Sequence, residues 1–269
     1  MQPFTVSRGE SCLVLALPHT GTWLPPDVHG ALDERGQRLT DTDWHLDRLY
    51  ADLVPDATVV SASFHRYLID ANRDPSGRSL YPGQNTTGLC PVTDFDGRPI
   101  YREGQDPTPQ DIQARLEGFH APYHAALEAE LARVKARHGV AVLYDCHSIR
   151  SRIPYLFDGI LPDFNIGTND GASCAPALEE AVASICARAE GYSSVVNGRF
   201  KGGWTTRHYG KPEDGIHAVQ MELAQSTHLA AEELPFAYDG EKAERLRVHL
   251  KAILEALSER ALAGALARH

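Results

Sequence analysis

Several polar residues in the sequence have side chains that can bind a metal ion or transfer a proton. His19 and His147 each come shortly after an apolar run, Asn72-Arg73 follows another, and Glu222 lies within an apolar segment late in the chain. Two histidines and a carboxylate are a standard ligand set for catalytic zinc, and they leave a fourth position for water. A further carboxylate that does not hold the metal can act as general base. These residue types together indicate a metal-dependent hydrolase.

Four apolar runs predict the strands that deliver these side chains, at residues 12–17, 58–64, 140–144 and 216–223. Leucine and alanine recur at helical intervals between and after them, over residues 111–137, 175–190 and 241–263, with a break expected at Pro122. Strands that alternate with helices predict an α/β fold with a twisted, mostly parallel mixed sheet and helices on both faces. Ligands bind such sheets beyond the carboxyl ends of the strands. The polar groups are therefore expected at one edge of the sheet.

Two further segments are expected to border this edge. A helical spacing of apolar residues begins near Asp41, and it would place Asp43 and Asp47 one turn apart on the same helix face. Residues 76–107 are rich in Gly, Pro, Asn, Thr and Asp, and this segment is longer than an ordinary connection. We expect it to wall a site.

Composition limits the classes of protein to consider. The chain has 269 residues, of which 42% are hydrophobic and 23% charged, as in an ordinary folded protein. We predict a single domain over residues 1–269, large enough to fold without disulfides or a structural metal. The formal charge of −10 and the lack of a basic stripe argue against nucleic acid as a partner. Without a signal-like or membrane-spanning segment, we expect a cytoplasmic protein without a membrane partner, and the oligomeric state stays open.

The order of the motifs along the chain resembles that of a known family. The segments that carry the resemblance are Pro18-His19-Thr20-Gly21-Thr22, residues 41–50, Asp70-Ala71-Asn72-Arg73-Asp74-Pro75, Asp145-Cys146-His147-Ser148-Ile149, residues 197–205 and Met221-Glu222-Leu223. They resemble the N-formylglutamate amidohydrolases, within the zinc carboxypeptidase-like superfamily. The resemblance runs over almost the whole chain, and the order of the motifs carries more weight than any one of them.

The resemblance implies a catalytic zinc, or another divalent metal, bound by His19 and His147, with Glu222 as the general base. The carboxypeptidase pattern has a glutamate ligand three residues after the first histidine, where this chain has Thr22. We therefore predict Asp47 as the third ligand. Asp43 is the alternative, either as a ligand or as a partner that orients an imidazole.

The implied reaction is hydrolysis of N-formyl-L-glutamate to formate and L-glutamate in histidine degradation. Arg73, helped by Asn72, is expected to bind one carboxylate of this small dicarboxylate substrate, because a planar guanidinium recognises a carboxylate bidentately. Arg207, in the glycine-rich loop 198–215, is the candidate for the second carboxylate. Another N-acyl-amino-acid amidohydrolase and a non-catalytic metabolite-binding protein are the alternatives, and the intact Glu222 argues against the second.

Overall fold

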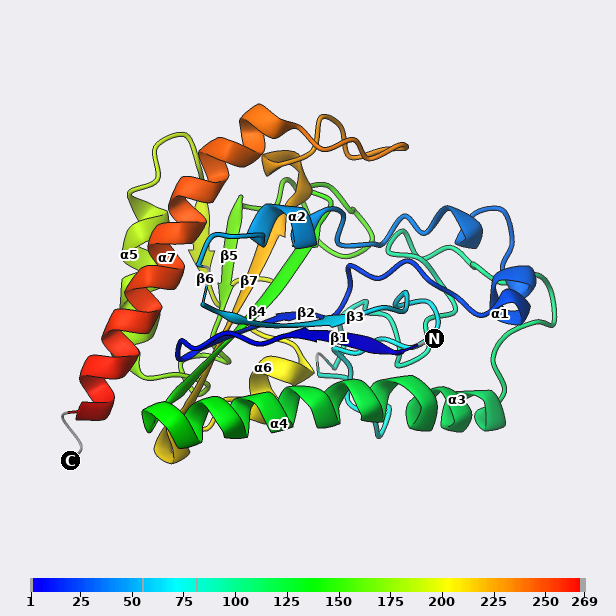
Figure 1. Ribbon diagram of the computed structural model, residues 1–269. Coiled ribbons are helices and arrows are strands. Elements are labelled where there is room, and N and C mark those ends of the chain that lie inside the picture. The colour runs from blue at the N-terminus through cyan, green and yellow to red at the C-terminus, as the bar shows by residue number, and fades with distance from the viewer. Residues whose placement is uncertain (1, 55, 81, 267–269) are drawn as a thin grey trace.

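One mixed sheet organises the chain, seen in a computed structural model that describes residues 2–54, 56–80 and 82–266 (Figure 1). Within these residues the sheet has seven strands in the order β1-β3-β2-β4-β7-β5-β6. Four neighbouring pairs are parallel, while β1–β3 and β5–β7 are antiparallel. The strands are β1 (Phe4–Ser7), β2 (Leu13–Leu17), β3 (Thr58–Ala62), β4 (Ala141–Ile149), β5 (Phe164–Gly167), β6 (Ser194–Val196) and β7 (Ile216–Ala224). The predicted mostly parallel mixed sheet is therefore confirmed.

Helices lie on both faces of this sheet (Figure 1). Helices α3 and α4 run along one face, where α6 also lies, and α5 and α7 pack together on the other side. The helices are α1 (Pro26–Ala31), α2 (Leu46–Tyr50), α3 (Pro109–Arg115), α4 (Ala121–His138), α5 (Pro176–Ala187), α6 (Trp204–Tyr209) and α7 (Gly240–Leu266). In the described part of the chain, no helix combines the length and apolar character that crossing a membrane requires. The α/β class is as the sequence predicts.

The long helical segment before β4 is continuous rather than broken. It begins with a capping box, in which the Thr108 side chain accepts from the backbone N–H of Asp111 and the Asp111 side chain accepts from that of Thr108. A π-helical turn, Leu116–His120, joins α3 to α4 directly before Pro122, the residue at which a break was predicted. Proline lacks the N–H of an α-helical hydrogen bond and its ring crowds the preceding turn, yet here it follows the π-turn without ending the helix. The helix then ends at Gly139, in a left-handed conformation with φ of 71°.

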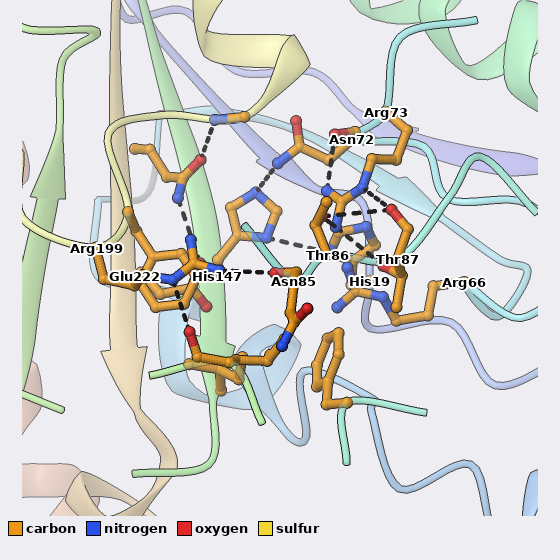
Figure 2. Close-up of a pocket in the computed structure, with 16 residues that line it drawn as sticks. His19, Arg66, Asn72, Arg73, Asn85, Thr86, Thr87, His147, Arg199 and Glu222 are labelled. Atoms are coloured by element: carbon orange, nitrogen blue, oxygen red, sulfur yellow. Dashed lines mark hydrogen bonds between the residues drawn. The ribbon is translucent and has the colours of Figure 1, made fainter. Parts of the chain in front are cut away.

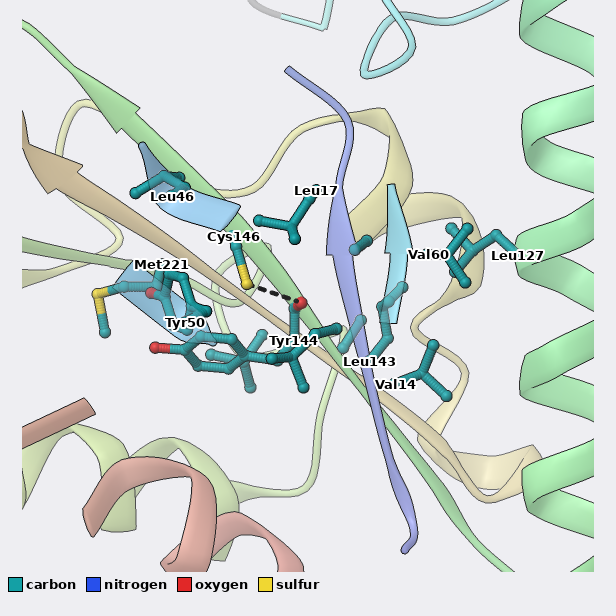
Figure 3. Packing of buried hydrophobic residues seen from close by; sticks show 14 of the residues in the cluster. Val14, Leu17, Leu46, Tyr50, Val60, Leu127, Leu143, Tyr144, Cys146 and Met221 are labelled. Atoms are coloured by element: carbon teal, nitrogen blue, oxygen red, sulfur yellow. Dashed lines mark hydrogen bonds between the residues drawn. The ribbon is translucent and has the colours of Figure 1, made fainter. Parts of the chain in front are cut away.

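The core lies on both sides of the central strands β2 and β4, in which every residue is buried. Figure 3 shows Leu143 toward the α4 side with Leu127, whereas Tyr144 lies on the opposite face with Tyr50 and Met221. Consecutive residues of a strand point to opposite faces, so a strand covered on both sides is apolar wherever it packs in the core, as in all of β2 and in residues 141–144 of β4. Each such fully buried large side chain contributes about 1.5–3 kcal/mol of transfer free energy. This rigid centre fixes the positions of the side chains at the strand ends.

Candidate active site

Two histidines and an aspartate meet where the central strands end. His19 follows β2, His147 lies near the end of β4, and Asp43 lies in the segment before α2. The two histidine Nδ1 atoms are 3.2 Å apart, and Asp43 Oδ2 lies 3.2 Å from Nδ1 of His147 and 3.7 Å from Nδ1 of His19. All three residues are at most 2% exposed. The fold thus brings three metal-binding atoms together in the protein interior.

The spacing of these atoms fits a metal ion. Ligand atoms about 2.0–2.1 Å from a tetrahedral zinc lie about 3.3–3.4 Å from one another, close to the distances found here. The remaining ring nitrogens face carboxylates: His19 Nε2 is 2.7 Å from Asp70 Oδ1, and His147 Nε2 is 3.0 Å from Asp145 Oδ1. Partners of this kind orient metal-binding imidazoles. Asp43 Oδ1 is buried and lies 3.6 Å from Arg66 Nη1, so Oδ2 is the oxygen that faces both imidazoles.

The electrostatics of the cluster favour an ionised carboxylate. Burial alone would raise the pKa of Asp43, but hydrogen bonds and charge from His147 and His19 lower it below its ordinary value. Burial alone would likewise lower the pKa of His147, yet Asp145 and the hydrogen bond to Asp43 raise it. The ionised Asp43 carboxylate therefore supplies a negative charge that would favour a metal cation at this cluster.

Asp47, predicted as the third ligand, does not lie in this cluster. It is exposed in the first turn of α2 and borders a separate groove on the far side of that helix, beside Tyr50 and Ser61. The predicted helix begins only at Leu46, because His45 has a left-handed conformation with φ of 61°. Asp43 and Asp47 are thus not one helical turn apart. The geometry places Asp43, the alternative ligand, in the cluster and Asp47 outside it.

Glu222 lies beside the cluster without belonging to it. It is the β7 partner of His147 in the parallel β4–β7 pair, is 8% exposed, and lines the same cleft. Gln220 Nε2 donates to Glu222 Oε2 over 3.3 Å. Burial, the largest cause, raises the pKa of Glu222 to about 8, with the charge of Asp43 adding to it and that of His147 opposing it. A carboxyl group with such a pKa can both accept and donate a proton near neutrality.

The two histidines and Glu222 line one cleft (Figure 2). Asn85, Thr86, Thr87 and Phe95 form part of its wall, so the segment 76–107 borders the site as expected. The guanidinium groups of Arg66, Arg73 and Arg199 also line it. A cleft with these cations suits an anionic ligand.

The three arginines differ in how they are held. Arg66 is buried and forms an ion pair with Asp70 over 2.8 Å. Arg73 donates from Nε to the carbonyl of Thr87 over 3.0 Å and lies 3.8 Å from the Asp70 carboxylate. Arg199 donates to backbone carbonyl oxygens. Arg66 is therefore largely neutralised by aspartate, whereas the Arg73 guanidinium lies farther from Asp70 and is held at the wall of the cleft by Thr87.

Arg207, predicted for the second carboxylate, is not among the residues that line the cleft. It lies on α6, and its Nε donates to the carbonyl oxygen of Gly202 over 2.8 Å. Sequence reasoning passed over Arg199, although it belongs to the quoted motif at residues 197–205. It also passed over Asp70 as the partner of His19, although Asp70 begins the quoted segment that contains Asn72-Arg73.

Two histidines of the continuous helical segment 109–138 hold the backbone of the segment that carries Asn72 and Arg73. His124 Nε2 lies 2.7 Å from the carbonyl oxygen of Ala71, and His120 Nε2 lies 3.1 Å from that of Arg73. His120 is the last residue of the π-helical turn, a feature that often accompanies functional sites. Two imidazoles on successive helical turns thus hold the peptide groups on both sides of Asn72.

A glycine allows the Asn72 amide to reach its place. A Cβ on Gly203 would lie 2.2 Å from Asn72 Nδ2, so any side chain there would displace the amide. Thr205 N donates to Asn72 Oδ1 over 2.9 Å, and Gly203 N donates to Gln220 Oε1 over 2.7 Å. The glycine-rich loop therefore positions residues that contact His147 and Glu222.

The fold and the cleft define a class: α/β proteins with a candidate metal centre at the carboxyl edge of a mixed sheet, beside a buried glutamate. The chain belongs to the N-formylglutamate amidohydrolase family, whose sequence profile matches residues 11–229. N-formylglutamate deformylase of Pseudomonas aeruginosa is 51% identical over 252 residues, covering 93% of this chain and 94% of that protein. The Pseudomonas putida deformylase is 49% identical over the same number of residues, covering 93% of each.

Solved structures agree with this assignment. The N-formylglutamate amidohydrolase of Ralstonia eutropha JMP134 has a TM-score of 0.79 and 25% identity, covering 97% of this chain and 99% of that one. A protein from Agrobacterium tumefaciens, with a TM-score of 0.73, is 19% identical and covers 96% of both chains, and it supports the fold alone. The matched family region contains His19, Asp43, His147 and Glu222.

Proposed function

We propose that this protein is a metal-dependent amidohydrolase that converts N-formyl-L-glutamate and water to formate and L-glutamate. The observation that carries the proposal is the buried cluster of His19, Asp43 and His147 next to Glu222, in one cleft with Arg73. The two Pseudomonas relatives, which are named N-formylglutamate deformylases, support the choice of substrate. A place in histidine degradation and a cytoplasmic location stay predictions.

The three clustered side chains would hold the metal, which we propose to be zinc, since two imidazoles and a carboxylate suit it. Other divalent metals can use the same ligands. When bound, the metal supplies Lewis-acid chemistry, polarising a carbonyl oxygen and making water a stronger acid. Asp70 and Asp145, next to the outer ring nitrogens of His19 and His147, would keep the two imidazoles oriented.

Glu222 carries the proton in the proposed reaction. Its carboxylate accepts a proton from the attacking water as the new C–O bond forms at the formyl carbon. The same group then returns that proton to the amide nitrogen as the C–N bond breaks, which releases formate and glutamate. The raised pKa of Glu222 suits it to both steps.

Arg73 positions the substrate. Its Nε and Nη2 groups bond to Thr87, so its guanidinium is oriented before a ligand arrives. A carboxylate paired with this guanidinium would hold the formyl group toward the cluster, and such positioning contributes to rate by avoiding the entropy cost of orientation. Asn72 lines the same wall, and its amide also contacts His147.

A panel of N-acyl amino acids, assayed with and without a chelator, tests the proposal. We expect the highest kcat/KM for N-formylglutamate, loss of turnover on chelation, and recovery on addition of zinc. Faster hydrolysis of a different acyl group would make the protein another N-acyl-amino-acid amidohydrolase. Turnover that survives complete metal removal, or binding without turnover of any amide, would contradict the proposal.

A further inference from the structure

We propose that His120 and His124, two buried histidines of the helical segment 109–138, are positioning residues that set where Arg73 and Asn72 lie in the site. His120 acts through Arg73 on carboxylate binding, and His124 acts through Asn72 on the reaction step. The inference rests on the proposed function, because it assigns the residues that align its substrate-binding segment. Neither histidine is among the residues that line the cleft.

The two imidazoles hold the backbone on both sides of Asn72. The carbonyl oxygen of Ala71 lies 2.7 Å from His124 Nε2, and that of Arg73 lies 3.1 Å from His120 Nε2. A carbonyl oxygen can only accept a hydrogen bond, so each ring carries a proton on Nε2 and donates it. The peptide groups before and after Asn72 are therefore each fixed by a side chain from outside the cleft.

The His124 ring is held in one orientation. Burial lowers the pKa of His124 to about 3, so the ring is neutral and its Nδ1, 3.1 Å from the Tyr209 hydroxyl, is an acceptor. The ring stacks on Tyr209 with 5.9 Å between centres and lies edge-on to Trp204 at 4.6 Å. A flip of the ring would place a carbon atom where Nε2 now faces the Ala71 carbonyl. The packing that prevents the flip therefore preserves the donor.

The π-helical turn brings His120 beside His124. His120 ends this turn, and residues four apart lie on one face of a helix. The centres of the two rings are 4.3 Å apart. Trp204, the first residue of α6, packs against His120 with 5.6 Å between ring centres, and its backbone N–H donates to the carbonyl oxygen of Asn72 over 3.4 Å. One packed group thus binds three successive carbonyls, those of residues 71–73.

The segment held in this way delivers two side chains to the cleft (Figure 2). The Asn72 amide nitrogen lies 3.0 Å from His147 Nε2, while the Arg73 Nε and Nη2 groups bond to Thr87. A shift of the peptide before Asn72 moves its amide relative to a metal-binding histidine, whereas a shift after it moves the guanidinium. A misplacement of about 1 Å can cost about 100-fold in rate. Loss of each histidine should therefore give its own kinetic defect.

Leucine and glutamine variants of each histidine test these roles in the metal-loaded enzyme. Leucine removes the donor, whereas glutamine has an Nε2 that can donate in place of the imidazole. We expect His120→Leu to raise KM for N-formylglutamate about 10-fold while kcat stays within about threefold, and His124→Leu to lower kcat by about 10- to 100-fold. The glutamine variants should recover most of each loss.

His138→Leu is the matched control. His138 lies on the same helix, and its Nε2 is also close to a backbone carbonyl oxygen, that of Glu10 at 2.8 Å. Neither of these residues lines the cleft. The kinetics of His138→Leu should therefore equal those of the wild type.

A double-mutant cycle separates positioning from a purely structural role. In an Arg73→Gln background, His120→Leu should change KM by less than about twofold, because the group that His120 positions is gone. The same rise in both backgrounds would overturn the role of His120, and wild-type kcat in His124→Leu would overturn that of His124. Circular dichroism and thermal melting check folding. If His120→Leu does not fold, His120→Asn, whose amide is too short to reach the Arg73 carbonyl, takes its place in the cycle.

Binding of glutarate, a dicarboxylate that cannot be hydrolysed, separates this inference from the proposed function. In isothermal titration of the metal-loaded protein, we expect His120→Leu to weaken glutarate binding about 10-fold and His120→Gln to restore it. That pattern in a protein that does not hydrolyse N-formylglutamate would keep the positioning role and reject the proposed function. Unchanged binding in His120→Leu, or a wild type that does not bind glutarate, would reject the positioning role whatever the turnover.

Discussion

Replacing Asp43 by asparagine should remove most of the metal affinity, whereas the same change at Asp47 should leave it intact. Asp43 is the anionic member of the cluster, 3.2 Å from Nδ1 of His147, and it is 1% exposed. Asp47 is exposed and borders a different groove. The two substitutions are chemically identical and four residues apart, so they form a matched pair.

The expected size of the effect follows from the contacts. Loss of a partner that only orients a ligand typically costs 10- to 100-fold in metal affinity, which is the expectation for Asp70→Asn, since Asp70 lies 2.7 Å from His19 Nε2. Asp43→Asn removes a ligand itself and leaves two neutral imidazoles. We therefore expect a loss of at least about 100-fold, or about 2.7 kcal/mol. Asp47→Asn should change affinity by less than about twofold.

Competition with a chromogenic chelator gives the zinc dissociation constants of the three variants, and circular dichroism checks their folding. Asp43 Oδ2 also accepts from the backbone N–H of Ser148 over 3.1 Å, and the asparagine Oδ1 can retain that bond. Folding should thus survive the change. Wild-type affinity in Asp43→Asn together with a large loss in Asp47→Asn would refute the ligand assignment. Equal losses in Asp43→Asn and Asp70→Asn would make Asp43 an orienting group.

Three further predictions concern catalysis, substrate binding and stability. Glu222→Gln should keep bound zinc while kcat falls by about 10²- to 10⁴-fold, and near-normal turnover would exclude Glu222 as the proton carrier. Arg73→Lys keeps the charge but loses the planar fork of the guanidinium. The transition-state stabilisation for N-formylglutamate, calculated from kcat/KM, should therefore fall by about 1–3 kcal/mol, and full activity would reject a bidentate contact. Acid should destabilise the fold through His228. This side chain is buried, and burial lowers its pKa to about 4. Because the unfolded chain binds this proton near pH 6.5, His228 favours folding above pH 6.5, and about 3 kcal/mol is lost as the pH falls toward 4. Urea unfolding between pH 7 and 4.5 should show this loss, with a shallower slope in His228→Gln; equal slopes would contradict it.

The sheet was predictable because its central strands are covered on both faces. A strand such as β2 has no polar face, so its sequence is an unbroken apolar run that ends in a polar turn. The length of β4 was harder to predict, since it continues past Tyr144 to Ile149 by pairing with β7 along its whole length. His147 therefore lies within a strand and faces Glu222, rather than in a turn after it. The short strands β1 and β5 have four residues each and were not predicted.

The errors share a physical cause. The apolar residues after Asp41 do recur at helical intervals. This local spacing does not predict the positive φ of His45, which depends on contacts with residues far along the chain. One of these is the hydrogen-bond contact of 2.9 Å between the His45 ring and the carbonyl of Phe236. Tertiary contacts such as this one decide whether an aspartate before the helix turns inward.

The same reasoning explains why the histidines were easier to place than the arginines. A residue that ends a central strand has its position fixed by the sheet register, and His147 and Glu222 are direct partners in that register. Arg199 and Arg207 lie eight residues apart in one loop and short helix, where the direction of each side chain depends on bonds to distant segments. Arg199 is turned into the cleft by carbonyls of residues 85 and 156, while Arg207 is tied to Gly202 beside its own helix. Sequence position alone therefore predicts which side chains meet at this edge of the sheet better than it predicts the directions of side chains in the loops.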